Sequence, residues 1–168
     1  MADFQTAAGL ILTEEGVYSN LASDGGGETK FGVARNRHPE ITDAQWAAWT
    51  PADSLALFRS GYWDANRCGE MPWPFALCLF DADVNQGDVK AADLLQQALG
   101  LVVDGKIGAV SLARIATATN DDLAHFMALR ALAYAGLGNF STFGHGWFNR
   151  LFIVHGQAIL GQATALVG

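Results

Sequence analysis

Two acidic residues near the N-terminus, Glu15 and Asp24, have the side-chain types that hydrolysis of a glycosidic bond requires. That reaction needs one carboxylic acid to protonate the leaving oxygen and a second group to orient water or stabilise the positively charged sugar ring. Their spacing alone also fits a frayed helix end at Glu15 and an ordinary turn residue at Asp24. The elements that hold the two residues therefore have to be considered next.

The segment before Glu15 has the apolar periodicity of an amphipathic helix over residues 3–15. At 100° per residue, Glu15 lies about 20° from Ala8 and about 40° from Ile11, on the apolar face. Glu14 is turned about 100° farther toward solvent. Burial at the end of such a face would raise the pKa of the Glu15 carboxyl, and a general acid needs a raised pKa to hold a proton near neutral pH.

Helical periodicity stops where a polar, glycine-rich segment begins. Residues 18–31 contain the triple glycine Gly25-Gly26-Gly27 and have no apolar stripe. This composition predicts a glycine-turned loop or a short β-hairpin. A helix end and one hairpin would thus place Glu15, Asp24 and Thr29 along one wall of a cleft.

The rest of the chain is predicted to be helical. Thr42 with Gln45 forms a capping box, and Thr50-Pro51-Ala52-Asp53 starts a second short helix that Gly61 closes. Apolar periodicity, caps and glycines predict further helices over residues 75–85, 88–99, 110–118, 120–135 and 151–168. The last helix carries no formal charge, but its polar side chains favour a packed terminal helix over a membrane span. The predicted fold class is α+β, mostly α-helical, with a small N-terminal β-hairpin beside the first helix.

Charge and cysteine content narrow the possible partners. The 168 residues carry 10 Lys and Arg against 17 Asp and Glu, a formal net charge of −7. The basic residues are scattered singly, which disfavours nucleic acid because phosphate binding needs a basic groove. Cys68 and Cys78 lack metal-ligand spacing, so we expect buried thiols, with a single disulfide as the alternative. The four histidines are isolated, so we expect no metal site, and hydrolysis of a glycosidic bond needs no cofactor.

A series of motifs runs along the chain in a fixed order. As they stand in this sequence, they are Glu15-Gly16-Val17-Tyr18, Asp24-Gly25-Gly26-Gly27-Glu28-Thr29-Lys30-Phe31-Gly32-Val33, Tyr62-Trp63, Phe80-Asp81, Val84-Asn85-Gln86-Gly87, Val103-Asp104-Gly105-Lys106-Ile107-Gly108, and Gly146-Trp147 with Arg150. They resemble the motifs of glycoside hydrolase family 108, whose members are bacterial and phage N-acetylmuramidases. Val17 departs from the family pattern, which has a second glycine at that position.

The resemblance implies a lysozyme-like fold and an endolysin-type lysozyme that cleaves the β-1,4 bond between N-acetylmuramic acid and N-acetylglucosamine. Glu15 would be the general acid, while Asp24 would hold the water and Thr29 would orient it. Glu28 is the rival second carboxylate, although we expect it to face solvent. The separation of the two carboxylates, about 6.5–9.5 Å or about 5–5.5 Å, would decide between inversion and retention.

The same resemblance implies one compact domain over residues 1–168. Its catalytic region, 1–87, would be completed by a helical, peptidoglycan-binding-like region, 88–168, that is integral to the fold. The residues expected to bind the glycan are Tyr18, Gly26, Gly27, Tyr62, Asn85 and Asp104. Asn85 is alternatively a cap of its own helix, and Asp104 is alternatively a turn residue between two helices.

Peptidoglycan glycan strands are therefore the expected partner of a monomer that does not insert stably into the membrane. The first residues lack a secretory signal, so we expect synthesis in the cytoplasm and release to the cell wall by a holin or a secretion system. Two alternatives stay open. One is a lytic transglycosylase, which yields anhydromuropeptides, and the other is a catalytically silent wall-binding module.

Overall fold

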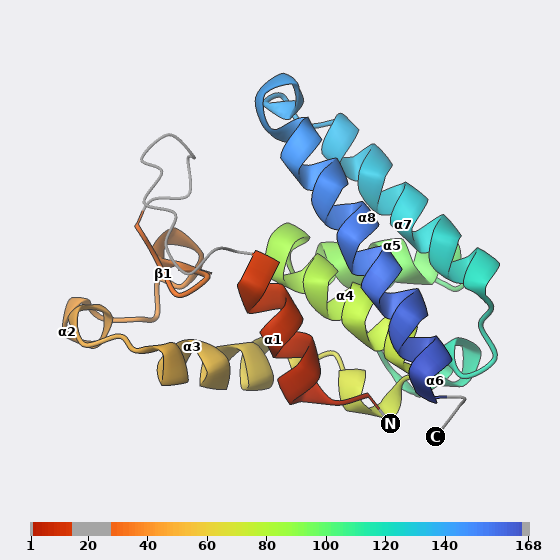
Figure 1. Ribbon diagram of the computed structural model, residues 1–168, viewed down its shortest axis with the longest axis horizontal. Coiled ribbons are helices and arrows are strands. Elements are labelled where there is room, and N and C mark those ends of the chain that lie inside the picture. The colour runs from red at the N-terminus through yellow and green to blue at the C-terminus, as the bar shows by residue number, and fades with distance from the viewer. Residues whose placement is uncertain (1, 15–27, 166–168) are drawn as a thin grey trace. The chain divides into compact units, whose positions relative to one another are not determined.

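The computed structural model describes residues 2–14 and 28–165. The chain divides into two compact units, one from Phe4 to Gly61 and one from Tyr62 to the C-terminal helix. Helices dominate both units, and the sheet among the described residues is a single two-stranded hairpin (Figure 1). The predicted class, α+β and mostly helical with a small hairpin near the N-terminus, is confirmed.

The first unit contains one longer helix, the hairpin and two short helices. Its elements are α1 (Phe4–Glu14), β1 (Thr29–Lys30), β2 (Val33–Ala34), a 3-10 turn (Arg35–Arg37), α2 (Asp43–Ala47) and α3 (Pro51–Leu57). The apolar stripe that predicted α1 is buried, at Phe4, Ala8 and Ile11. The strands lie at the C-terminal edge of the predicted hairpin segment, with their turn at Phe31 and Gly32.

Both short helices begin at the cap residues that the sequence predicts, and both caps are reciprocal capping boxes. Thr42 Oγ1 accepts from Gln45 N at 3.3 Å, and Gln45 Oε1 accepts from Thr42 N at 2.9 Å. Thr50 and Asp53 make the same reciprocal pair at 3.3 Å and 2.8 Å. Each box satisfies two backbone N–H groups that the helix start would otherwise leave without acceptors. These caps support helices of only five and seven residues.

The prediction that Gly61 closes the second short helix is wrong. The helical path continues past Leu57 as a π-helix, Phe58–Asp64, and Gly61 lies within it. Gly61 does not adopt the positive φ that ends a helix at glycine, in contrast to Gly87 at 91° and Gly100 at 68°. A glycine without left-handed geometry weakens a helix but does not stop it.

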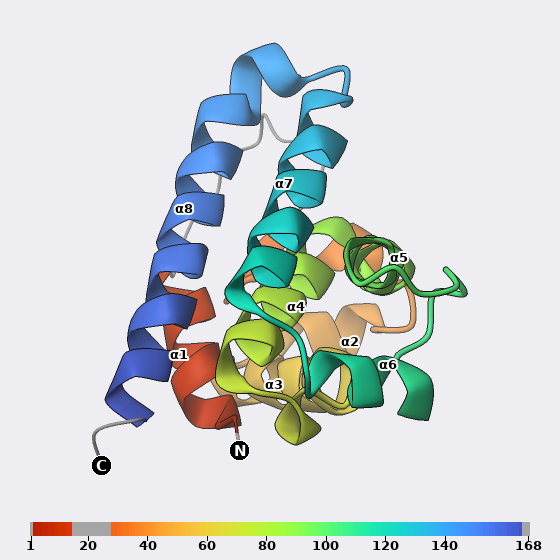
Figure 2. The same ribbon diagram turned by 90° about the vertical axis from the view of Figure 1, so that its right-hand side faces the viewer.

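Helix α4 (Trp73–Gln86) is the centre of the second unit. A 3-10 turn (Cys68–Glu70) precedes it, and it is followed by α5 (Asp88–Ala98), α6 (Ala109–Ile115), α7 (Asn120–Ala135) and α8 (Phe140–Ala165). Helix α4 packs against α5, α7 and α8, and its side chains from 74 to 83 are buried. Figure 2 shows α7 and α8 side by side as an antiparallel pair. The predicted buried helix is confirmed, and the turn at Gly87 that separates the predicted regions 1–87 and 88–168 lies inside this unit.

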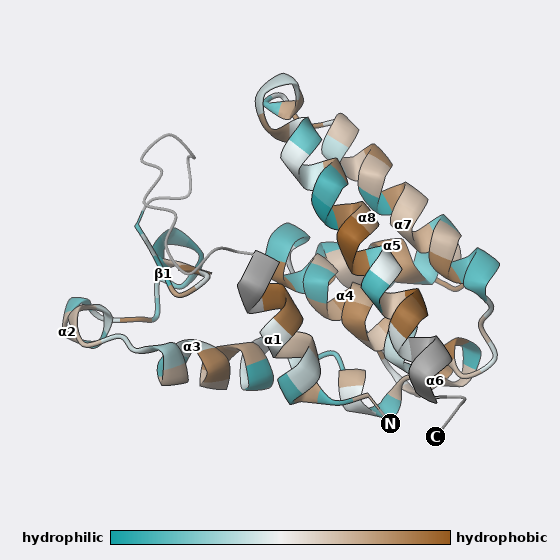
Figure 3. Cartoon of the chain, in the orientation of Figure 1, coloured by the Kyte–Doolittle hydropathy of each residue, from teal (hydrophilic) through white to brown (hydrophobic). Residues whose placement is uncertain are grey.

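Helix α8 begins at Phe140, well before the predicted start at residue 151. Glycines in its first turns are poor helix formers, so the sequence does not indicate a helix there. For one of these glycines, packing explains why a larger residue would not fit. A Cβ atom at Gly144 would approach the ring of Phe140 to 2.5 Å. A Cβ atom at Gly161 would likewise overlap the indole of Trp73 from α4. Figure 3 shows hydrophobic and hydrophilic positions alternating along α8. Among the described residues, no helix combines the length and apolar character that crossing a bilayer requires.

Both cysteines are buried free thiols, as the sequence predicts. Burial raises the pKa of the Cys78 thiol to about 12, and burial also raises the pKa of the Cys68 thiol. Because the thiolate is the reactive form, neither side chain is a nucleophile at neutral pH.

Candidate active site

The hairpin presents Thr29 on the face opposite to the one that packs on α2. Thr29 pairs with Ala34, and Lys30 pairs with Val33. Directly opposed residues share a face of the sheet, and neighbours along a strand point to opposite faces. Val33 is buried, so the face of Lys30 and Val33 is the packed one. The half-buried Thr29 side chain lies on the other face, where its cross-strand neighbour is only a methyl group.

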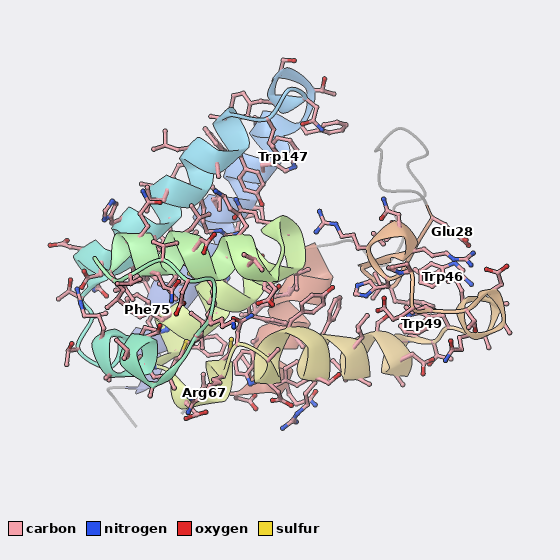
Figure 4. All side chains as sticks on the ribbon, turned by 180° about the vertical axis from the view of Figure 1, so that it is seen from behind. Glu28, Trp46, Trp49, Arg67, Phe75 and Trp147 are labelled. Atoms are coloured by element: carbon pink, nitrogen blue, oxygen red, sulfur yellow. The ribbon has the colours of Figure 1, made fainter. Side chains whose placement is uncertain are left out.

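Trp46 on α2 fixes the packed face of the hairpin. Lys30 Nζ donates to the Trp46 carbonyl oxygen at 2.6 Å and lies 5.3 Å from the centre of its indole ring. The guanidinium of Arg35 lies 5.9 Å from the same ring. Trp49 lies beside Trp46, at 5.8 Å between ring centres, and its Nε1 donates to Ser54 Oγ on α3 at 2.8 Å (Figure 4). The indoles therefore tie the hairpin to both short helices.

Glu28 directly precedes β1 and has an exposed side chain, as predicted from the sequence (Figure 4). Its backbone carbonyl accepts from Arg35 N at 2.9 Å, which extends the hairpin pairing by one bond. The Glu28 carboxylate lies 4.0 Å from the Arg35 guanidinium, which also pairs with Asp43. A carboxylate that is 53% exposed in its side chain and close to a cation lacks the burial that makes a general acid.

The other predicted residues around this hairpin lie outside the described residues. They are Glu15, Tyr18, Asp24, Gly26 and Gly27. The described chain reaches Glu14 at the end of α1 and resumes at Glu28, so it brackets this segment on both sides. Their roles stay predictions.

Asn85, near the C-terminal end of α4, is half-buried and bonded to its own helix. Its Nδ2 donates to the backbone oxygen of Asp81 at 2.7 Å and to Asp81 Oδ1 at 3.3 Å. The amide therefore has the helix-bound geometry that the sequence analysis gives as one alternative. Its half-exposed position leaves the expected contact with a glycan as a prediction.

Sequence reasoning missed the buried charge cluster next to Asn85. Arg130 on α7 donates from Nη2 to Asp81 Oδ2 at 2.7 Å, and Arg150 on α8 donates from Nε to Asp81 Oδ1 at 2.7 Å. The side chains of Asp81 and Arg130 are fully buried. Arg130 Nε also donates to Gln86 Oε1 at 2.8 Å. An acid inside the strongly apolar stretch of α4 was the available signal, because a buried charge requires a partner.

A second buried acid, Asp83, lies on the same helix. Asn66 Nδ2 donates to Asp83 Oδ2 at 2.6 Å and to Asp88 Oδ1 at 3.0 Å, so one amide bridges two carboxyl groups. Burial, reinforced by the charge of Asp88 and opposed by the bond from Asn66, raises the pKa of Asp83 to about 7. Asp83 Oδ1 is buried, and within residues 2–14 and 28–165 it has no hydrogen-bond partner.

Asp104 lies in the loop between α5 and α6 and is held by the buried side chain of Gln96. Gln96 Nε2 donates to Asp104 Oδ1 at 2.7 Å, while Gln96 Oε1 accepts from the backbone N–H groups of Asp104 and Gly105 at 3.0 Å and 3.1 Å. The bond from Gln96, followed by the bond from Lys106 N, lowers the pKa of the exposed Asp104 carboxyl. The structure thus gives Asp104 a turn role and leaves glycan contact as a prediction.

Tyr62, the remaining predicted binding residue, is half-buried in the π-helix, whereas the neighbouring Trp63 is buried edge-on against Phe80 at 5.5 Å between ring centres.

The described ranges contain no group of three or more His, Cys, Asp and Glu side chains that would hold a metal ion.

Comparisons with known proteins place these features in a family context. Residues 8–87 match the family model described as glycosyl hydrolase 108. The solved structure of Brucella abortus SagA is similar to this chain, with a TM-score of 0.86 and 27% sequence identity over 95% of each chain. The match shows a lysozyme-like fold. No curated protein matches the chain.

Proposed function

We propose that the chain is a peptidoglycan N-acetylmuramidase, because residues 8–87 match the family model described as glycosyl hydrolase 108, which supports a glycoside hydrolase. Its substrate is the β-1,4 bond between N-acetylmuramic acid and N-acetylglucosamine. The observation that carries the proposal is the family match across the segment that holds Glu15, Asp24 and Thr29. The described geometry supports it, because the hairpin is anchored on one face and offers Thr29 on the other.

In the proposed reaction, Glu15 donates its proton to the glycosidic oxygen as the bond to the sugar carbon breaks. Asp24 holds the attacking water or stabilises the positively charged ring, and the Thr29 hydroxyl orients the water. When water attacks, its oxygen forms the new bond to the sugar carbon and its proton passes to a carboxylate. The place of Glu15 in the sequence supports this role, since it directly follows Glu14, the last residue of α1.

The substitution Glu15→Gln tests the proposal most directly, because it removes the proton donor with little change of shape. We expect the variant to release no reducing ends from purified peptidoglycan while its circular dichroism spectrum and unfolding midpoint match those of the wild type. Glu14→Gln is the matched control, because the same change at the neighbouring position leaves the general acid in place. Full activity in the Glu15→Gln variant sinks the assignment.

The second carboxylate needs a separate test. We expect Asp24→Asn to lower kcat at least about tenfold, the effect typical of a positioned acid–base group. Glu28→Gln, which alters the exposed rival carboxylate, should leave kcat near the wild-type value. The opposite pattern would move the second role from Asp24 to Glu28.

Mass spectrometry of the released muropeptides distinguishes hydrolysis from the two alternatives. Reducing N-acetylmuramic acid ends support the proposal, whereas 1,6-anhydro ends identify a lytic transglycosylase. Binding to sacculi without any release of fragments identifies a silent wall-binding module.

A further inference from the structure

We propose that Lys30 is a positioning residue for the hydrolysis, which binds helix α2 and thereby holds strand β1 in the orientation that the Thr29 hydroxyl needs. This inference rests on the proposed function, because that function gives Thr29 the role of orienting the water. It assigns a role to a side chain on the opposite face of the strand, one that acts on the reaction only through Thr29.

The hairpin is too short to hold Thr29 by its own pairing. Each strand has only two residues, Thr29–Lys30 in β1 and Val33–Ala34 in β2. A two-stranded hairpin by itself is marginally stable in water, and a slip of one residue turns every side chain to the other face. A catalytic side chain has to stay within about 0.5 Å of its productive position. Contacts from outside the hairpin are therefore needed.

Lys30 supplies such a contact from the position next to Thr29. Its Nζ donates to the backbone oxygen of Trp46 at 2.6 Å, in the last turn of α2, where cationic side chains are favoured. The same ammonium group lies 5.3 Å from the centre of the Trp46 ring, which is itself buried. One side chain thus ties β1 to both the backbone and the indole of Trp46.

The other strand has an anchor of its own at the opposite end of α2. Arg35 directly follows β2 and pairs with Asp43, the first residue of α2. Its guanidinium lies 5.9 Å from the centre of the same Trp46 ring. Lys30 is therefore the anchor of the strand that carries Thr29, and Arg35 is the anchor of its partner strand.

Packing alone does not require a lysine at position 30. Its cross-strand partner, Val33, lies on the same face with a buried apolar side chain. A second apolar residue would avoid the loss of side-chain entropy and of solvation that a half-buried lysine carries. Apolar contact has no preferred direction, whereas a hydrogen bond to one carbonyl oxygen does. The lysine can therefore fix how β1 is rotated about its own axis.

The substitution Lys30→Met tests the inference in the full chain, because it removes the charged donor and keeps a long apolar side chain. We would measure kcat and KM on soluble peptidoglycan fragments, at a temperature where circular dichroism shows each variant folded. We expect kcat to fall about tenfold with KM nearly unchanged, since a displacement of 1 Å can cost roughly a hundredfold. Lys30→Arg should recover most of kcat, because a guanidinium also donates and also stacks on an indole.

Lys90→Met is the matched control for Lys30→Met. It makes the same change of charge at an exposed lysine of α5, which belongs to the other compact unit. Both kcat and KM should stay at the wild-type values. If the Lys30→Met variant does not fold, Lys30→Gln replaces it, since glutamine keeps a neutral donor on a shorter side chain.

A double-mutant cycle shows whether Lys30 acts through Thr29. Thr29→Val exchanges the hydroxyl for a methyl group of similar size, and its kcat is compared with that of the double variant Thr29→Val with Lys30→Met. We expect the double variant to be no slower than Thr29→Val alone, because no hydroxyl remains to be positioned. A merely structural role for Lys30 would instead multiply the two losses.

A measurement on the free protein needs no substrate. The ¹⁵N order parameter of the Thr29 backbone N–H group reports how firmly β1 is held. We expect a value near that of rigid backbone, about 0.85, in the wild type and in Lys90→Met, and a fall toward about 0.6 in Lys30→Met.

The outcomes separate this inference from the proposed function. An unmoved order parameter, multiplied losses in the double variant, or a Lys30→Arg variant as slow as Lys30→Met each overturn the positioning role of Lys30. An unchanged kcat in Thr29→Val removes Thr29 from the reaction and overturns that role as well. In all four cases, reducing ends released by the wild type still support the muramidase, whereas a wild-type chain that releases none overturns both proposals.

Discussion

Asp81 and Asp83 are buried on the same helix, and yet their surroundings give them opposite electrostatic roles. Asp81 has two arginines, from α7 and α8, at 2.7 Å. Asp83 has no cation among its described partners, only the amide of Asn66 and the nearby charge of Asp88, and its pKa is raised to about 7. Burial alone therefore does not decide the charge of a carboxyl group. The groups supplied by neighbouring helices give Asp81 two cations and join three helices, whereas the surroundings of Asp83 raise its pKa.

Removal of Arg130, one of the two cations that pair with Asp81, should change the stability of the protein most strongly. Arg130→Met leaves the Asp81 charge buried with one cation fewer, and the loss of a partner from a buried ion pair costs about 3–5 kcal/mol. We expect a decrease of that size in the free energy of unfolding, measured by urea denaturation. Arg67→Met is the control, because Arg67 pairs with Glu70 at the surface at 2.7 Å and exposed pairs contribute little to stability. Equal losses in the two variants would remove the distinction between buried and exposed pairs.

The substitution Asp83→Asn should raise the free energy of unfolding at pH 8, and by less than Arg130→Met lowers it. The pKa of Asp83 is raised from 3.8 to about 7 in the folded protein, so the unfolded chain loses this proton at lower pH than the folded one. The free energy of unfolding should therefore decrease as pH rises from about 4 to about 7, and level off above that. Asp83→Asn should remove this contribution and stabilise the protein at pH 8 by about 1–3 kcal/mol. Urea denaturation at pH 5 and pH 8 gives the answer, and a variant less stable than the wild type at pH 8 would contradict it.

The substitution Asp88→Asn should have the smallest effect on stability of the three, and it tests how much the charge of Asp88 contributes to the raised pKa of Asp83. Asp88 raises the pKa of Asp83 by charge repulsion, second to burial. Without that charge, the pKa of Asp83 should fall part of the way toward its ordinary value, as NMR titration of its side-chain carbonyl carbon would show. The gain in stability at pH 8 should stay below about 1 kcal/mol, because Asp88 is exposed. An unmoved pKa would leave burial as the whole cause.

Features set by neighbouring residues could be predicted from the sequence, and features set by distant ones could not. The capping boxes at Thr42 and Thr50 depend on residues three positions apart, and both are present. The bond from Arg130 to Asp81 joins residues 49 positions apart, and no local pattern pairs them. The start of α8 was missed for a different reason, since the glycines in its first turns are poor helix formers.

The candidate site shows a similar division. The position of Thr29 on a hairpin followed from polar and glycine composition, but its pairing with Ala34 required the structure. The turn itself uses Phe31 at a φ of 48°, a conformation that few residues other than glycine, asparagine and aspartate adopt. Gly32 supplies the second positive φ of the turn, at 80°, but the residue type of Phe31 does not predict a turn. The expected exposure of Glu28 is confirmed. A charged residue directly before a surface strand and near Arg35 needs no distant partner to keep it exposed.

The buried Gln96 side chain has a consequence for how the loop after α5 moves. Its single amide replaces the hydrogen bonds that a neighbouring strand would give to Asp104 and Gly105. Those two backbone N–H groups should therefore exchange with deuterium only when Gln96 leaves the core, although Asp104 is exposed. In hydrogen-exchange kinetics this surface loop should open together with α5, as part of the same cooperative unit.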